Sequence, residues 1–309
     1  MTQYDVAVVG EIYIDHIFTG FTAWPQPGEE AFARQYHQEI GGGAANTACA
    51  LGRLGRTVDL VGVIGSSDAA WFEQRLLEFG VAGNGVCKTD GNTGVTVSVS
   101  MVDDRSFFTY AGENEKLIDI LRSDTVLASL TRARHVHFAL PLDRDLANDL
   151  LPILRNAGCT ISLDVGFQQD WLIDPGNLET CRATDYFLPN EREAYMLCGC
   201  GGAAAYLAFA QKNGLTAAVI KLGSHGAAMQ MNGTAFKVAS PVVKVVDTTG
   251  AGDAFNAGFI DAVLDKATPE ECLRRACICG GLSTRVAGAL RALPGREEVM
   301  NIYAETYAS

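Results

Sequence analysis

The segment Asp247-Thr-Thr-Gly-Ala-Gly-Asp-Ala-Phe255 follows an apolar run that ends at Val246. Its small residues permit a tight turn, and the apolar pattern that begins at Asp253 predicts a helix. A turn of this kind points backbone N–H groups and the positive end of a helix dipole at one place, which suits an anion such as a phosphate. A carboxylate at a helix start is usually a cap. A cap needs no flanking glycines, however, whereas a base that works beside a phosphate needs backbone without side chains.

Strand-like and helix-like stretches alternate outward from this segment. Residues 4–10 form a Val-rich run stopped by a glycine, typical of a strand buried on both faces. Regular alternation of strand and helix predicts right-handed crossovers and a doubly wound, mostly parallel sheet in a single α/β domain over residues 1–309. The further strands are predicted near residues 58–64, 135–140, 160–165, 185–188, 217–221 and 242–246.

Two segments near the N-terminus interrupt this alternation. Residues 12–40 mix aromatic, Thr and charged residues around the turn Trp24-Pro-Gln-Pro-Gly28, and Val and Ser alternate between residues 95 and 110 around Asp103-Asp104. These patterns favour exposed antiparallel strands. We therefore expect a small β-sheet lid, built from about residues 12–40 and 92–112.

Composition and charge exclude several classes of partner. The chain is 48% apolar and 19% charged, which is typical of an ordered globular enzyme. A net charge of −12 with scattered Lys and Arg argues against nucleic acid and anionic membranes, but not against a nucleotide held by backbone N–H groups. The nine unevenly spaced cysteines favour reduced thiols, and no apolar run is long enough to span a membrane. We expect a cytoplasmic protein.

A second glycine-rich motif, Gly41-Gly-Gly-Ala-Ala-Asn46, precedes the first one in the chain. In this order the two motifs resemble the signatures of the ribokinase family, the PfkB carbohydrate kinases. The resemblance implies a three-layer αβα sandwich with a β lid, and an enzyme that transfers the γ-phosphoryl group of ATP to a sugar hydroxyl. It also implies that Asp253 is the catalytic base and that the anion hole is formed by Gly250, Ala251 and Gly252.

Further site residues follow from the same resemblance. Asn190-Glu-Arg-Glu193 is similar to an Asn-x-x-Glu motif that organises Mg²⁺, often through water, although its spacing fits a helix capping box equally well. The sugar hydroxyls would contact Asp15, Gly42, Gly43 and Asn46. The nucleotide would contact Lys221, Gly223, Gly226 and Cys277, where Lys221 replaces a common Thr. Asp247 and Thr249, with backbone carbonyls near Ser283, Val286 and Gly288, would form a loop for a monovalent cation such as K⁺.

The nature of the acceptor is suggested by departures from the best-known relatives. Residues 137–141 are apolar where ribose kinases tend to have an acidic residue, and Gln168 stands where kinases of acidic sugars often have Arg. These positions favour a neutral monosaccharide, with Arg105 as the remaining cationic candidate. Two alternatives stay open: a nucleoside kinase of the same fold, since aromatic residues crowd the predicted lid, and a nucleotide- and sugar-binding sensor without turnover. Unpaired lid edges and the resemblance predict a homodimer through the lids.

Overall fold

The computed structural model describes residues 4–100 and 105–307. Its larger sheet has nine strands in the order β13-β12-β11-β10-β9-β8-β1-β4-β5. Neighbouring strands run parallel from β5 to β11, and β12 and β13 are antiparallel additions at one edge. The strands are β1 (Tyr4–Gly10), β4 (Val58–Gly65), β5 (Val81–Thr89), β8 (Ala133–Ala139), β9 (Thr160–Leu163), β10 (Tyr186–Phe187), β11 (Ala217–Lys221), β12 (Ala227–Met231) and β13 (Thr234–Val238).

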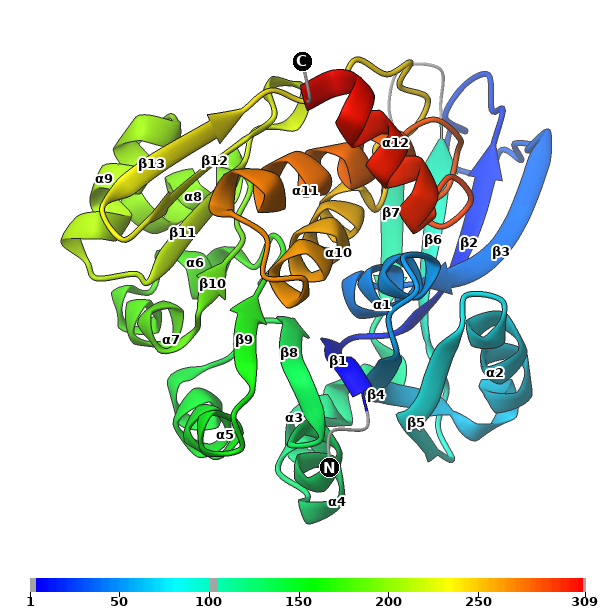
Figure 1. Ribbon diagram of the computed structural model, residues 1–309. Helices are drawn as coiled ribbons and strands as arrows, with labels where there is room; N and C mark the ends of the chain where they lie inside the picture. The colour runs from blue at the N-terminus through cyan, green and yellow to red at the C-terminus, as the bar shows by residue number, and fades with distance from the viewer. Residues whose placement is uncertain (1–3, 101–104, 308–309) are drawn as a thin grey trace.

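Helices cover both faces of this sheet (Figure 1). The alternation within β1 accounts for the two layers, because Ala7 and Val9 pack into one core while Val6 and Val8 pack into the other. The first core contains α3 (Leu117–Leu121), α4 (Asp124–Leu130), α5 (Arg144–Asn156), α6 (Gln169–Ile173), α7 (Leu178–Ala183), α8 (Glu191–Cys198) and α9 (Ala203–Lys212). The second contains α1 (Gly43–Arg53), α2 (Ala69–Leu77), α10 (Ala251–Leu264), α11 (Pro269–Ser283) and α12 (Arg296–Tyr307).

A smaller sheet stands beside the larger one, in the order β3-β2-β6-β7 (Figure 1). Its strands are β2 (Tyr13–Thr19), β3 (Gln35–Gly41), β6 (Gly94–Ser100) and β7 (Arg105–Tyr110). The β2–β3 and β6–β7 pairs are antiparallel, and β2 runs parallel to β6. The predicted turn at Asp103-Asp104 falls outside the described residues.

Residues 242–246 do not form the predicted strand. Val242 is fully exposed, Val245 and Val246 are more than half exposed, and the segment has no place in either sheet. An apolar run predicts burial but does not say what covers it. The β12–β13 hairpin and β5 were not predicted from the sequence. Within residues 4–100 and 105–307, none of the helices combines the length and apolar character needed to cross a bilayer.

Candidate active site

Polar side chains gather where the parallel strands of the larger sheet end. Lys221 is the last residue of β11, Asp164 follows β9, and Asn190 follows β10. The N-terminus of α10 faces the same edge and brings Asp253. Carboxyl ends of neighbouring parallel strands are the usual place for a ligand in such a sheet. Here these four residues line one cavity of about 740 Å³.

The turn before α10 has the geometry expected of an anion site. Gly250 has a φ of 72°, and a Cβ there would lie 2.6 Å from the Cβ of Ala289, so a side chain is excluded on both grounds. The N–H of Ala251 donates to the carbonyl of Thr248 at 3.2 Å. The following N–H groups, those of Gly252 and Asp253, belong to the first helical turn and have no intrahelical acceptor. They are the donors left for a ligand.

The Asp253 carboxylate touches the second glycine motif across the molecule. Its Oδ2 accepts a hydrogen bond from Nδ2 of Asn46 at 2.9 Å, and a Cβ on Gly43 would lie 3.4 Å from its Oδ1. Burial raises the pKa of Asp253 to about 7, while the bond from Asn46 acts in the opposite direction. The Oδ1 of Asn46 is buried and has no hydrogen-bond partner among the described residues. This oxygen can therefore accept a hydrogen bond from a bound ligand.

Asp15 lies on β2 against the start of the same motif. A Cβ on Gly41 would lie 2.0 Å from its Oδ1, so only glycine leaves room for the carboxylate. Glu39 pairs with Asp15 across the β2–β3 ladder and is ion-paired to Arg75 of α2 at 2.6 Å. Burial, and then the charge of Glu39, raise the pKa of Asp15 to about 7. Gly42 has a φ of 93° at the N-cap of α1.

Lys221 belongs to a buried cluster that the sequence reasoning did not predict. Its Nζ lies 2.6 Å from Oδ2 of Asp164 and 3.4 Å from Oδ1 of Asn256, and Asn256 donates to the same Asp164 oxygen at 2.6 Å. Burial alone would raise the pKa of Asp164, but Lys221 and Asn256 lower it below its usual value. The position of Asp164 at the end of the strand predicted over residues 160–165 was the available signal for its place at this edge. Nothing in the sequence distinguished Asn256 from a polar helix residue without a role in the site.

Asn190 and Glu193 form the capping box that their spacing allowed. The Glu193 N–H donates to Oδ1 of Asn190 at 2.9 Å, and the Asn190 N–H donates to Oε2 of Glu193 at 2.8 Å. Burial, and then the charge of Asp164, raise the pKa of Glu193. Both residues also line the cavity. Within the described ranges, no three His, Cys, Asp or Glu side chains are grouped so that they could hold a metal ion by themselves.

Asp247 ties the turn to the loop that follows α11. Its Oδ1 accepts hydrogen bonds from the N–H and the hydroxyl of Thr249 at 2.9 and 2.7 Å, and its Oδ2 accepts one from the N–H of Gly288 at 2.9 Å. The N–H groups of Val246 and Asp247 both donate to the carbonyl of Thr284. The predicted cation loop is therefore a compact, hydrogen-bonded unit next to α10.

The rest of the cavity wall combines glycines with apolar side chains. Gly223 and Gly226 lie in the loop after β11, and a Cβ on Gly226 would lie 2.0 Å from the carbonyl oxygen of Val238. Cys277 is buried on α11 and lines the same space. Val242, Val243 and Val245 line it too, which explains why this apolar run is exposed and not in a sheet.

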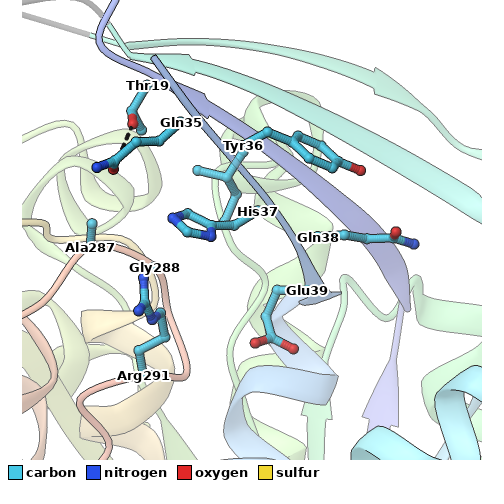
Figure 2. Close-up of a pocket in the computed structure, with 10 residues that line it drawn as sticks. Thr19, Gln35, Tyr36, His37, Gln38, Glu39, Ala287, Gly288 and Arg291 are labelled. Carbon is cyan, nitrogen blue, oxygen red and sulfur yellow. Dashed lines mark hydrogen bonds between the residues drawn. The ribbon is translucent and has the colours of Figure 1, made fainter. Parts of the chain in front are cut away.

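A second cavity of about 370 Å³ lies between the smaller sheet and residues 287–291 (Figure 2). In Figure 2, His37 and Gln35 of β3 face Arg291 and Gly288 across this space, and Glu39 lies at its lower end. The Asp15 face of the smaller sheet is therefore open on its β3 side. Arg105 is the first residue of β7, opposite Ser100, and its side chain lies outside the described part of the structure.

Comparison with protein families gives a match over nearly the whole chain. The model described as "pfkB family carbohydrate kinase" matches residues 3–296. Among characterised relatives, a ribokinase from Haemophilus influenzae is 27% identical over 318 residues, which cover 96% of this chain and 97% of that protein.

Solved structures give similar folds. A ribokinase from Arabidopsis thaliana complexed with ribose and ATP superposes with a TM-score of 0.84 at 27% identity and covers 97% of this chain and 98% of that one. A putative ribokinase II from E. coli in complex with ATP and Mg²⁺ has a TM-score of 0.83 at 20% identity, covering 98% of this chain and all of that one (100%). The second likeness concerns the fold alone.

Proposed function

The chain belongs to the pfkB family of carbohydrate kinases, and we propose that it transfers the γ-phosphoryl group of ATP to a hydroxyl of a small neutral sugar. Its fold is ribokinase-like and its class is that of a phosphotransferase with an alcohol acceptor. The observation that carries the proposal is the placement of one carboxylate, Asp253, in the first turn of α10, where the backbone N–H groups of Gly252 and Asp253 have no intrahelical acceptor. A base and an anion site in the same turn are what phosphoryl transfer to an alcohol requires.

In this proposal Asp253 removes the proton from the attacking hydroxyl. Asn46 holds its Oδ2, so Oδ1, which faces Gly43, is the oxygen that accepts the proton. A pKa of about 7 suits a general base at neutral pH, because the carboxylate is both ionised and basic. The N–H groups of Gly252 and Asp253, in the turn with Gly250 and Ala251, then stabilise the charge on the transferring group.

ATP fits the cavity of about 740 Å³ between the turn and the loop after β11. The valines of residues 242–245 and Cys277 give an apolar wall for the adenine, while Gly223 and Gly226 let the backbone approach. Lys221 lies at the phosphate end with the acidic residues. The named relatives support ATP as the donor, since one of them was solved with ribose and ATP.

The floor of this cavity also fits Mg²⁺. Asp164, Glu193 and Asp253 bring three carboxylates and Lys221 one ammonium, so negative charge is in excess. Mg²⁺ keeps several waters and is usually held by one or two carboxylates together with substrate phosphates, which agrees with the absence of an all-protein cage in the described ranges. Asn190 and Glu193 would hold it, partly through water. Bound there, it would offset the charge of the phosphates.

We propose a monovalent cation such as K⁺ at the loop of Asp247 and Thr249. The Asp247 carboxylate already accepts three hydrogen bonds, so the cation would be bound by backbone carbonyls that this residue keeps in place. Its position next to α10 would stabilise the turn at Gly250. Replacement of K⁺ by choline in the assay is expected to lower kcat, and unchanged activity would remove this part of the proposal.

A neutral acceptor agrees with the charges near Asp15. Asp15 and Asp253 would repel a sugar acid or sugar phosphate, and Gln168, which is exposed, offers no opposite charge. The Asp15 carboxylate and the unpartnered Oδ1 of Asn46 would accept hydrogen bonds from sugar hydroxyls, and the backbone N–H groups of Gly42 and Gly43 would donate to them. The smaller sheet would close over this sugar as a lid.

Reduced thiols at all nine cysteines support a cytoplasmic enzyme.

A nucleoside acceptor is the second candidate. The β2–β6–β7 register places Phe107 on the face of the smaller sheet that carries Asp15, and this ring is 52% exposed. A base stacked on it would extend from a ribose held at Asp15.

The test is an assay of ADP release from Mg-ATP with neutral monosaccharides, sugar acids and nucleosides as acceptors. We expect turnover only with one or a few neutral monosaccharides. Turnover with nucleosides alone would favour the second candidate. Binding of ATP and sugar, measured by calorimetry, without any ADP release would instead identify a sensor.

A further inference from the structure

We propose that Asp164 and Asn256 hold Lys221 as a fixed positive charge for the γ-phosphoryl group, so that the protein distinguishes ATP from ADP through this lysine. The inference rests on the proposed function, because it takes ATP as the donor. It assigns Lys221 a partner in the nucleotide, and it assigns Asp164 and Asn256 the role of positioning residues.

Three separate elements build the cluster. Lys221 ends β11, Asp164 follows β9, and Asn256 lies on α10 one turn after Asp253. A spacing of three residues puts Asp253 and Asn256 on the same helix face. The base and the lysine cluster are therefore attached to one rigid helix. The residues Asp164 and Asn256 are 9% and 0% exposed, which fixes their rotamers by packing.

The hydrogen bonds leave the ammonium partly free. Lys221 Nζ donates to Asp164 at 2.6 Å and reaches Asn256 at 3.4 Å. An ammonium group has three donors, and the described residues provide no acceptor for the third. Because Lys221 lines the cavity, this donor is available to a ligand bound there.

The position of the ammonium selects the γ-phosphoryl group. A Cβ on Gly252 would lie 3.6 Å from Nζ, so the charge sits directly against the first turn of α10, whose N–H groups have no intrahelical acceptor. Among the described residues that line the cavity, Lys221 is the one cationic side chain. A group placed for transfer beside Asp253 would lie within its reach, whereas the phosphates of ADP would lie farther from the base.

The local charges keep the lysine protonated. Burial alone would lower its pKa, but Asp164, and then Glu193, raise the pKa of Lys221 above its usual value. The same ion pair also matters for stability, since a single buried charge without a partner is strongly unfavourable. Lys221→Met alone would leave Asp164 in that state. The double variant Lys221→Met/Asp164→Asn replaces the ion pair with two neutral side chains and avoids the problem.

The experiment compares the affinities of ADP and of a non-hydrolysable ATP analogue, measured by calorimetry on the whole chain in the presence of EDTA, so that the loss of the Asp164 carboxylate cannot act through bound Mg²⁺. In the double variant we expect the triphosphate analogue to bind about tenfold more weakly and ADP to change by less than about twofold, as for the loss of one charge-assisted hydrogen bond. Asn256→Ala keeps the positive charge of Lys221 but removes one group that positions it. This variant should show a smaller loss of affinity for the triphosphate analogue, again with little change for ADP. Lys212→Met, an exposed lysine of α9, is the matched control and should leave both affinities unchanged.

The outcomes are distinguishable. Thermal unfolding shows whether the double variant is folded. If it is folded and the ratio of its two nucleotide affinities equals that of the wild type, the lysine has no role in selecting the triphosphate. Equal weakening of both nucleotides would also overturn the inference, because it would indicate a structural role only. If the wild-type protein binds neither nucleotide, the proposed function itself fails.

Discussion

At the residue scale, the chemistry of this protein depends on where Asp253 finds its partners. One oxygen is held by Asn46, 207 positions away in the chain, and the other faces a glycine. Burial raises its pKa, while Asn46 and Lys221 counteract that shift in part. The glycine motif around Gly43 and the turn around Gly250 therefore act as one site, although each is a local feature of the sequence.

The pH dependence of turnover should reflect this carboxylate. With a pKa of about 7, Asp253 loses its capacity as a base as the pH falls through 7, so kcat should decrease about tenfold per unit below that value. Asn46→Ala removes a bond that lowers the pKa, and the decline should begin at higher pH. The measurement is kcat between pH 5.5 and 9 for both proteins. A flat wild-type profile over this range would contradict the assigned base.

The buried Asp15 carboxylate should lower the free energy of unfolding at neutral pH. Its folded-state pKa of about 7 exceeds the unfolded value, so the folded protein binds the proton more tightly and stability falls as the pH rises from about 4 to 7. Asp15→Asn should therefore raise the free energy of unfolding at pH 8 by about 1 to 2 kcal/mol and weaken sugar binding. Urea unfolding at pH 8 and pH 4.5 tests this, since the gain should be much smaller at the lower pH. A destabilised variant at pH 8 would refute the burial argument.

At the scale of elements, α10 is anchored at both ends. Its N-terminus forms the site, and near its C-terminus the buried Asp261 is paired with Arg56 at 2.7 Å, with Arg296 at 2.8 Å, and with Arg275 of α11. This cluster joins the segment after α1, α10, α11 and the start of α12. It holds the helix that carries the base.

Asp261→Asn should lower the free energy of unfolding by about 3 kcal/mol, because it leaves buried guanidinium groups with less counter-charge. The affinity for nucleotide should change little, since the cluster lies at the other end of α10. Thermal unfolding and calorimetry with ADP provide the two readings. Loss of binding without loss of stability would show that the cluster belongs to the site.

Local patterns predicted the elements whose function is local. The Val-rich run at residues 4–10 and the apolar pattern after the glycine turn have periods and residue types that specify their geometry. The strand was predicted in its place, and the helix begins at Ala251, two residues before the predicted start at Asp253. The structure of residues 242–246 was predicted wrongly, because the sequence of an apolar run that faces a ligand cavity looks the same as that of a buried strand. Asp164 and Asn256 were missed because their role depends on a contact between strands and a helix far apart in sequence.

At the scale of the whole molecule, the smaller sheet has an exposed apolar face. The strand alternation puts Tyr36, Phe108 and Tyr110 on the face opposite Asp15, and each is about half exposed. Trp24 stacks against Phe108 with the ring centroids 6.1 Å apart. Aromatic residues gathered on one sheet face favour a contact with a second copy of the chain.

We therefore predict a homodimer through the smaller sheets. Light scattering after gel filtration should give twice the chain mass of 32.9 kDa. Phe108→Asp, which places a charge in that face, should yield the monomer, and Ser106→Asp near the strand end should have a smaller effect. A wild-type monomer at micromolar concentration would contradict the prediction.

The central claim is that Asp253 is the base of a phosphoryl transfer. Its most direct test is Asp253→Asn in the ADP-release assay with the best acceptor, combined with calorimetry of the bound ATP analogue. Asp149→Asn, on the exposed side of α5, is the matched control. We predict that kcat falls by at least about a hundredfold in Asp253→Asn while the affinity for the analogue changes by less than about threefold. Turnover near the wild-type rate in that variant would contradict the account.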